Sequence, residues 1–238
     1  MPAGAAALAL LLCLLPAAAA GQAGEARERA AKAPLAVSSL LLDAAVRDGL
    51  VVAVGERGHV LISADAGQSW RQAEVETRAL LTGVYMHDAR LGWAVGHDEV
   101  VVRTRDGGLT WERVHNAPEN EKPLLDVWFA DERTGLGVGA YGGLLATSDG
   151  GDTWAPRTVH GDDDFHLNQI AAAADGTLFL AGEAGHLYRS DDRGATWQPL
   201  PSPYDGSFFG LLPMPDGTLL AFGLRGHLYR SPDGGRTW

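Results

Sequence analysis

The sequence is poor in cysteine and in basic side chains. Its 238 residues include one cysteine, Cys13, and 19 lysine and arginine residues against 30 aspartate and glutamate residues, which gives a formal net charge of −11. Proteins bind the phosphate backbone of nucleic acid through clustered Lys and Arg, so this charge balance argues against nucleic acid as a partner. A single cysteine cannot form a disulfide within the chain or a site of several thiolates.

A long apolar segment is also missing. The run 5–15 is shorter than the roughly 20 residues of a membrane-spanning helix, and Pro16 and four alanines follow it. This order is typical of a secretory signal peptide over residues 1–20, although no Lys or Arg precedes the run. Cleavage after Ala20 would remove Cys13, so we expect no cysteine chemistry in the mature chain. Residues 21–34 have no apolar stripe and are predicted to form a mobile leader.

The sequence is rich in apolar residues and glycine. Its hydrophobic content of 46% is enough for a buried core, and 31 glycines indicate many tight turns. The pattern Ser/Thr-x-Asp-x-Gly-x-Thr/Ser-Trp occurs five times, with its tryptophans 41 or 43 residues apart. We expect its Asp to accept main-chain hydrogen bonds, its Gly to take a positive φ and its Trp to pack against a neighbouring sheet. These residues are Asp65, Gly67, Trp70, Asp106, Gly108, Trp111, Asp149, Gly151, Trp154, Asp192, Gly194, Trp197, Asp233, Gly235 and Trp238.

One period of this repeat is divided into four short runs. In the second period three of them are apolar and one alternates, and turn residues separate them: 81–86, 91–95, 100–103 and 111–114. Runs of this length, rich in Val, Trp and Tyr, are typical of strands in consecutive hairpins. A period slightly above 40 residues fits one four-stranded propeller blade. We therefore predict an all-β fold over residues 35–238, a β-propeller of antiparallel blades packed radially so that both faces of each sheet are covered.

The five copies resemble the Asp-box, or bacterial neuraminidase repeat, of sialidases, sortilin-type receptors and other β-propellers. Two segments, 92–111 and 131–154, are similar more narrowly to the photosystem II assembly and stability factor family of lumenal propellers; they include Gly92-Trp93-Ala94-Val95-Gly96, Asp106-Gly107-Gly108-Leu109-Thr110-Trp111 and Asp149-Gly150-Gly151-Asp152-Thr153-Trp154. The resemblance covers about residues 40–238. It implies that the Asp-box turns lie on the side of the propeller away from the ligand.

The number of repeats predicts an incomplete propeller. The sequence ends at Trp238, the last residue of the fifth Asp-box, so we expect the fifth blade to lack its fourth strand. The resemblance implies a ring of six or seven blades. The sequence therefore predicts a fragment or a truncated gene, or closure of the ring by a partner chain.

Three patterns suggest chemistry, and each has a simpler interpretation. The resemblance to sialidases implies that activity would need an arginine triad, a Tyr/Glu nucleophile pair and an acid. The Arg-Ile-Pro stretch that sialidases carry before the first box is absent, and Tyr188 and Tyr229 share one repeat position, as packing residues do. His59, His186 and His227 also share a position, so they should be spread around a ring and form separate hydrogen bonds instead of one metal site. The run 162–164 of three aspartates is a candidate Ca²⁺ site, but such runs are more often solvated loops.

Binding is the remaining function, and loops on a rigid scaffold are where it is expected. The loops between second and third strands, together with the inter-blade segments, should gather on the face opposite the Asp-boxes: 56–57, 97–99, 140–141, 183–184 and 224–225, with segments near 78, 116–122, 162–166 and 204–209. The candidate partner-binding residues are Arg57, His97, Tyr141, Tyr204, Phe208 and Arg225. Arg57 and Arg225 share a repeat position, and the photosystem family places arginines on a partner-binding face. Phe208 has the alternative of filling core at the start of a strand.

Taken together, the residues predict an exported, non-catalytic β-propeller scaffold without a cofactor or metal. We expect it in the periplasm, or on the lumenal side if the source is photosynthetic, with a protein partner for which a membrane-protein complex is one candidate. The alternative is a glycan-binding or sialidase-like hydrolase propeller. The partner's identity and the total number of blades do not follow from the sequence.

Overall fold

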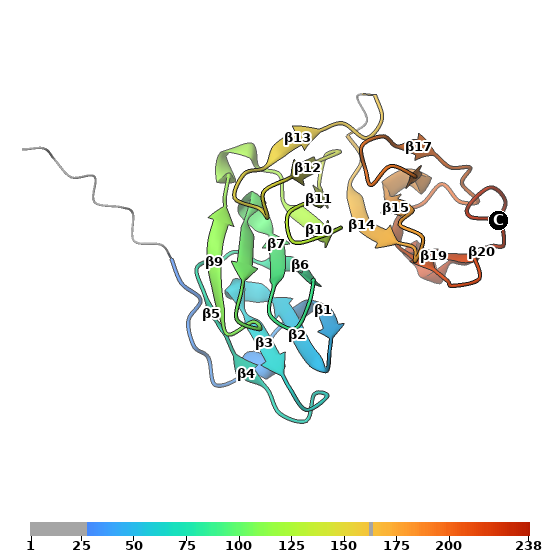
Figure 1. Cartoon of the computed structure of the whole chain (residues 1–238). Coiled ribbons are helices and arrows are strands. Elements are labelled where there is room, and N and C mark those ends of the chain that lie inside the picture. The colour runs from blue at the N-terminus through green and yellow to red at the C-terminus, as the bar shows by residue number, and fades with distance from the viewer. Residues whose placement is uncertain (1–27, 162–163) are drawn as a thin grey trace, which may run out of the picture.

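The computed structural model describes residues 28–161 and 164–238, and these form five sheets that follow one another around a common axis (Figure 1). The all-β propeller predicted from the repeat is confirmed. The signal-peptide interpretation and most of the 162–164 run lie outside the described residues. No helix among the described residues is long and apolar enough to cross a membrane.

The blades are antiparallel meanders in chain order. Blade 1 consists of β1 (Leu41–Arg47), β2 (Leu50–Gly55), β3 (Val60–Ser63) and β4 (Arg71–Gln72); blade 2 of β6 (Leu81–Met86), β7 (Gly92–Gly96), β8 (Val101–Thr104) and β9 (Thr110–His115), with β5 (Glu74–Val75) added at its edge; blade 3 of β10 (Leu124–Phe129), β11 (Gly135–Gly139), β12 (Leu144–Thr147) and β13 (Ala155–Arg157); blade 4 of β14 (Leu167–Ala172), β15 (Leu178–Gly182), β16 (Leu187–Ser190) and β17 (Gln198–Pro199); and blade 5 of β18 (Phe208–Pro213), β19 (Leu219–Gly223) and β20 (Leu228–Ser231). The first strand of each blade lies nearest the axis.

The eight-residue turns after the third strands are closed by their own polar groups. In the first turn, Ser69 donates through N–H and Oγ to the two carboxylate oxygens of Asp65, at 2.9 and 2.6 Å. The hydroxyl of Ser63 donates to Asp65 at 2.7 Å and accepts the N–H of Gly67 at 2.8 Å. The other four turns repeat these contacts. In four of the turns, hydrogen bonds from the hydroxyl and N–H of the residue four positions on lower the pKa of the aspartate to about 2: Asp65, Asp149, Asp192 and Asp233.

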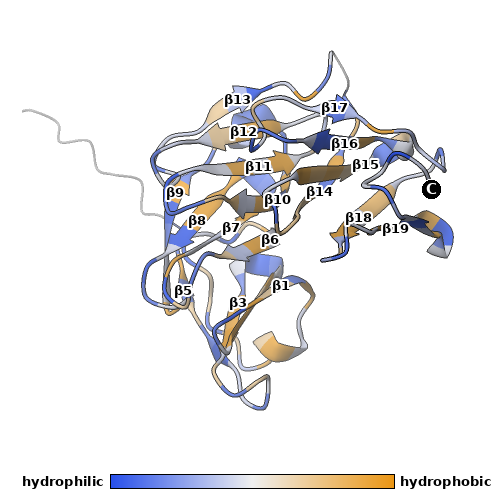
Figure 2. Ribbon diagram, turned by 45° about the vertical axis from the view of Figure 1, so that its right-hand side comes forward, coloured by the Kyte–Doolittle hydropathy of each residue, from blue (hydrophilic) through white to orange (hydrophobic). Residues whose placement is uncertain are grey.

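From blade 2 onward, these turns pack on the preceding blade. Gly108 of blade 2 lies beside Ile62 and Val52 of blade 1, and Gly194 of blade 4 lies beside Leu136 of blade 3. The apolar residues of adjacent blades form continuous buried clusters, and in Figure 2 much of the orange lies on the strands, such as β3, β11 and β18. Burial of these sheet faces is the main stabilising term, because a single four-stranded sheet cannot cover both of its faces.

Polar side chains tie neighbouring blades together at the axis. Each innermost strand has a bulge near its start, and in blades 1, 3 and 4 the bulge turns a side chain toward the next blade. The side-chain oxygen of Asp43 accepts a hydrogen bond from the N–H of Val84 at 2.8 Å. In the same way, Asp126 accepts the N–H of Ile170 at 2.8 Å and Gln169 accepts that of Leu211 at 2.7 Å. Between blades 2 and 3 the position is Gly83, and the adjacent Thr82 donates instead to the carbonyl of Leu124 at 2.7 Å. Every junction between described blades therefore has an axial hydrogen bond.

Arg103 on β8 joins blade 2 to blade 3 by charge. Its side chain is 7% exposed, and it donates to Glu112 on β9 and to Asp152 in the turn of blade 3, each at 2.7 Å. It also donates to the carbonyl of Gly150 at 2.9 Å, which accepts the indole N–H of Trp93 at 2.9 Å as well. The guanidinium fork thus fixes the blade 3 turn against the preceding blade.

We expect Arg103→Met to reduce the free energy of unfolding by about 1–3 kcal/mol. The cost stays at the lower end because Glu112 and Asp152 are about half exposed and water can solvate them. Urea denaturation measures the change. The control is Arg105→Met, whose guanidinium is 62% exposed and 3.9 Å from Glu112, and which should cost about 0.5 kcal/mol or less. Equal losses in both variants would contradict the role of Arg103.

Two local features differ from the sequence predictions. The fourth run of the first period is not one strand: β4 pairs with β3, and β5 then leaves blade 1 and pairs in parallel with β9 of blade 2. Residues 29–33, predicted as part of a mobile leader, are held against the segment 72–75, where Lys32 donates to the carbonyl of Gln72 on β4 at 2.7 Å and Ala30 N–H to that of Val75 on β5 at 2.9 Å. Main-chain groups at the outer edges of blades 1 and 2 provide these contacts.

Candidate functional site

The connections between second and third strands, here called the 2–3 turns, share one backbone geometry. Each contains two successive residues with positive φ, and the second is glycine in four of the five turns: Gly58, Gly142, Gly185 and Gly226. In blade 2 the corresponding residue is Glu99, with a φ of 51° after Asp98 with a φ of 61°. Glycine is the usual residue for this conformation, so Glu99 is the exception among the turns.

In two of the other turns an inter-blade linker leaves no room for a side chain at the second position. A Cβ atom at Gly58 would collide with the carbonyl oxygen of Thr77, and one at Gly185 with that of Tyr204. After blade 2 the linker instead forms a short 3-10 turn, η4 (Pro118–Asn120), which faces the 2–3 turn η3 (His97–Glu99). This arrangement accommodates the side chain of Glu99.

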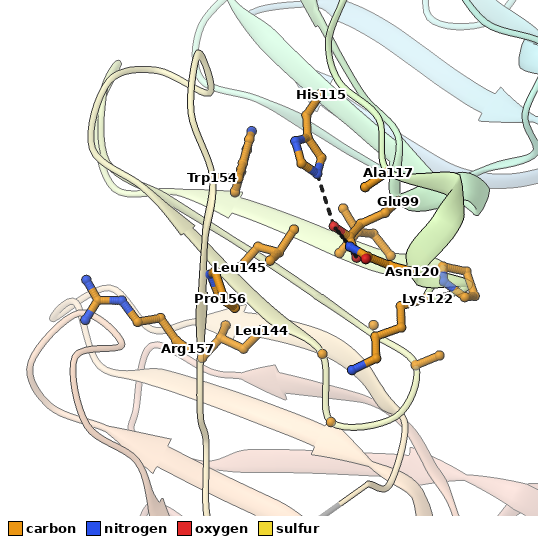
Figure 3. A pocket seen from close by; sticks show the side chains of 16 residues that line it. Glu99, His115, Ala117, Asn120, Lys122, Leu144, Leu145, Trp154, Pro156 and Arg157 are labelled. Atoms are coloured by element: carbon orange, nitrogen blue, oxygen red, sulfur yellow. Dashed lines mark hydrogen bonds and ion pairs between the residues drawn. The ribbon is translucent and has the colours of Figure 1, made fainter.

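A cavity of about 390 Å³ lies between blades 2 and 3 beside Glu99 (Figure 3). The Glu99 carboxylate is 7% exposed and accepts hydrogen bonds from His115 Nε2 at 3.1 Å and from Asn120 Nδ2 at 3.1 and 3.2 Å. The opposite wall is apolar and comes from β12 and the start of β13, with Leu144, Leu145, Trp154 and Pro156. The cavity thus combines a carboxylate at one side with an aromatic and aliphatic surface at the other.

A second cavity, of about 330 Å³, adjoins the first along the same loops. Lys122, Gly142 and Arg157 line both, and the second continues to His160 and Tyr188 on the side of blade 4. Lys122 and Arg157 have no hydrogen-bond or ion-pair partner among the residues that the structure describes. We call the two cavities together the loop groove. It extends from blade 2 to blade 4 and offers separate acidic and basic positions.

A third cavity, of about 680 Å³, lies at the axis and is lined by residues from all five blades. Asp43 and Asp126 both face it. Burial raises the pKa of Asp126 to about 7, against the opposing effect of hydrogen bonds from the N–H groups of Ile170 and Val127; the charge of Asp43 adds to the increase. Both oxygens of Asp126 already accept main-chain N–H groups, as do both of Asp43. These carboxyl groups therefore serve first as links between strands.

The structure brings some of the sequence candidates to the surface and buries one. Arg57, His97 and Arg225 are exposed at the tips of their 2–3 turns. Tyr141 is 54% exposed and meets His166 edge-on, with ring centroids 5.0 Å apart. Tyr204 is half-buried and stacks on His227 at 4.5 Å.

Phe208 is a correction to the predicted partner surface. Its side chain is fully buried among Leu211, Leu219 and Tyr229, because it begins β18 and fills the space between blades 4 and 5. Its neighbour Phe209 is 53% exposed and lines the axial cavity.

The three repeat-equivalent histidines make separate local contacts. His59 is buried and lies 3.1 Å from Ser39 Oγ, and this burial lowers its pKa. His186 lies 2.9 Å from the carbonyl of Glu183, and His227 lies 3.2 Å from the hydroxyl of Tyr229. The described residues contain no group of three or more His, Cys, Asp or Glu side chains placed to hold a metal ion.

Sequence reasoning included Glu99 in a loop but did not recognise it as part of a pocket. The repeat did contain a signal for this pocket, because Glu99 stands at the position where the other four turns carry glycine. Asn120 and Lys122 were named only as members of an inter-blade segment, and the detour of that linker was not predictable from its length.

The family model of photosynthesis system II assembly factor YCF48 matches residues 62–123 and 115–238, well over half of the chain. The chain belongs to this family. No curated protein matches it. Among solved structures, the YCF48-family chain is similar to "YCF48 bound to D1 peptide", with 19% identity and a TM-score of 0.67, over 83% of this chain and 67% of that chain.

Two further solved structures support the same fold. YCF48 from Cyanidioschyzon merolae has 17% identity and a TM-score of 0.59, over 77% of this chain and 63% of that chain. The GH74 enzyme of Niastella koreensis has 16% identity and a TM-score of 0.68, over 83% of this chain and 37% of that chain. At these identities the likeness shows the propeller fold alone, and this YCF48-family chain spans only part of the length of each.

Proposed function

We propose that this chain is a non-catalytic scaffold that binds a segment of a protein partner, in the manner of a photosystem II assembly factor. The observation that carries the proposal is the loop groove, whose two cavities run across three blades and share Lys122, Gly142 and Arg157. A groove of this extent suits an extended segment better than a single small molecule. Membership of the YCF48 family supports the proposal, as does a similar protein that was solved with a D1 peptide bound.

The proposed partner is a membrane protein exposed on the exported side of its membrane. The order of residues 1–20 supports export, because it has the apolar run and small residues of a secretory signal. Detection of the chain only in the cytoplasmic fraction of its host would contradict this part of the proposal.

Capture from detergent-solubilised membranes tests the proposal. The wild-type chain should retain one defined membrane protein at near-stoichiometric yield. A double variant, Lys122→Glu with Arg157→Glu, should lose it, because both residues line the shared part of the groove without internal partners among the described residues. Recovery of nothing beyond background, or equal capture by the double variant, would argue against the loop groove as the binding surface.

Glycoside hydrolysis is a second candidate because two carboxyl groups, Asp43 and Asp126, face one axial cavity and the fold matches a GH74 enzyme. We expect no turnover, since all four oxygens of these groups already accept main-chain N–H groups. Assays with xyloglucan and with a fluorogenic sialoside test this. Turnover that Asp126→Asn abolishes would favour the hydrolase.

A further inference from the structure

The backbone of the blade 2 turn carries a strain that the fold does not require. Positive φ at a residue other than glycine, Asn or Asp costs about 1–2 kcal/mol. All five turns carry a non-glycine residue at the first positive-φ position. At the second position four turns have glycine, which takes this conformation without cost, whereas blade 2 places Glu99 there at a φ of 51°. A non-glycine residue held in such a conformation is a reason to look for a function of its side chain.

The charge of Glu99 is incompletely compensated within the chain. Its carboxylate is 7% exposed, and its neighbours are the neutral amide of Asn120 and the ring of His115, which is charged only when protonated. Among the described residues, no lysine or arginine forms an ion pair with it. A buried carboxylate is costly without a positive partner. One of its oxygens accepts a single hydrogen bond, from Asn120 at 3.2 Å, and so has capacity for a further donor.

The cavity wall opposite this carboxylate suits the stem of a long basic side chain. Leu144 and Leu145 are buried, and Trp154 presents a half-buried ring to the cavity. Lysine and arginine pack their methylene groups on such surfaces, and a cation close to an indole face gains further attraction. In Figure 3 the head group of Arg157 points away from Glu99, so that side chain does not fill the space. The net charge of −11 also favours the approach of a basic segment.

We propose that the cavity between blades 2 and 3 binds a lysine or arginine side chain of the partner segment, with Glu99 as its ion-pair acceptor and Trp154 as its wall. This inference rests on the proposed function of the loop groove. His115 and Asn120 hold the Glu99 carboxylate in place for the incoming cation. The basic side chain supplies the positive charge that the folded chain, over its described residues, does not place beside Glu99.

Short capped peptides, acetyl-Gly-X-Gly-amide with X as Arg, Lys, Gln or Glu, test this with the full chain in calorimetric titrations. The Arg or Lys peptide should bind at least about tenfold more tightly than the Gln peptide, because only the former make a charge-assisted hydrogen bond. Glu99→Gln should reduce Arg binding to the level of the Gln peptide. Glu119→Gln is the matched control: Glu119 is an exposed carboxylate on η4 that does not line the cavity, so its loss should leave Arg binding unchanged.

Glu99→Gly is a second variant that tests the proposal without endangering the fold. This variant carries the residue of the four other turns, so it should fold, and it should lose the preference for Arg over Gln. The proposal is overturned if Glu99→Gln binds the Arg peptide as wild type does, if the Gln peptide binds equally well, or if the Glu peptide binds most tightly.

The outcomes also separate this inference from the proposed function. If the wild-type chain captures a membrane protein and Glu99→Gln captures it equally, the pocket assignment fails and the scaffold function stands. If the Arg peptide binds through Glu99 but no membrane protein is captured, the pocket stands and the scaffold function fails.

Discussion

Replacing Trp111 by alanine should reduce the free energy of unfolding by about 3–5 kcal/mol. The ring is 1% exposed and lies in the buried cluster that blades 1 and 2 share, and its indole N–H donates to the carbonyl of Gly108 at 3.0 Å. Removing it leaves a large cavity that the rigid sheets on both sides cannot close. Urea denaturation followed by circular dichroism measures the loss.

The matched control is Trp70→Ala, because Trp70 holds the same position in the repeat. Its side chain is 36% exposed, since no described blade precedes blade 1, and its loss should cost about 1 kcal/mol or less. The contrast isolates the contribution of packing between blades from that of the turn itself. If the two variants lost equal stability, the tryptophan would act within its own turn and the account of blade packing would be wrong.

The second large effect concerns pH and Asp126. Its pKa is about 7 in the folded chain, against 3.8 for an ordinary aspartate side chain, so the folded state binds more protons than the unfolded state between these pH values. The contribution of Asp126 to stability should therefore be fully present below about pH 4, decline as the pH rises to about 7 and be absent above it. A pKa raised from 3.8 to about 7 corresponds to a change of at most about 4 kcal/mol in the free energy of unfolding.

Asp126→Asn tests this assignment because an amide does not ionise. Unfolding measured from pH 4 to 8 should show a shallower fall in stability than the wild type, with the variant equal or superior at pH 8. Gln169 shows that a neutral acceptor serves the same purpose at the next junction, at 2.7 Å from its donor. The control is Asp175→Asn, because the N–H of Thr177 lowers the pKa of Asp175 and its titration falls below this range. A slope unchanged by Asp126→Asn would refute the assignment.

Much of this architecture follows from the sequence, because the Asp and Gly residues that recur in the repeat each have one specific role in a turn. Asp and Gly at fixed offsets define each turn, and strands between turns are short and apolar, so 81–86 was predicted with its observed bounds. The departure of β5 toward blade 2 was not predictable, since a parallel pair of two residues has no sequence pattern. The same holds for residues 29–33, whose contacts are to main-chain groups of a distant segment.

The functional surface was predictable only in outline. The repeat places the 2–3 turns on one side of the propeller. Arg57, His97 and Arg225 are exposed there, each at the tip of a different turn. The groove itself depends on the path of the linker 116–122 and on the space between two sheets, which no local pattern encodes. Phe208 was wrongly predicted to be on this surface. The sequence shows that Phe208 and Phe209 are adjacent apolar residues in a turn region, but it does not show which of the two rings is buried.

The axial hydrogen bonds have a consequence for how such a ring could have grown. In each of them one blade contributes a side chain and the next contributes only an N–H or carbonyl of its backbone, which nearly every amino acid supplies. A duplicated or inserted blade could therefore accept the axial hydrogen bond from its neighbour with its own main chain, whatever its side chains. Successive blades could then diverge in charge and loop length without losing the hydrogen bonds that join them at the axis.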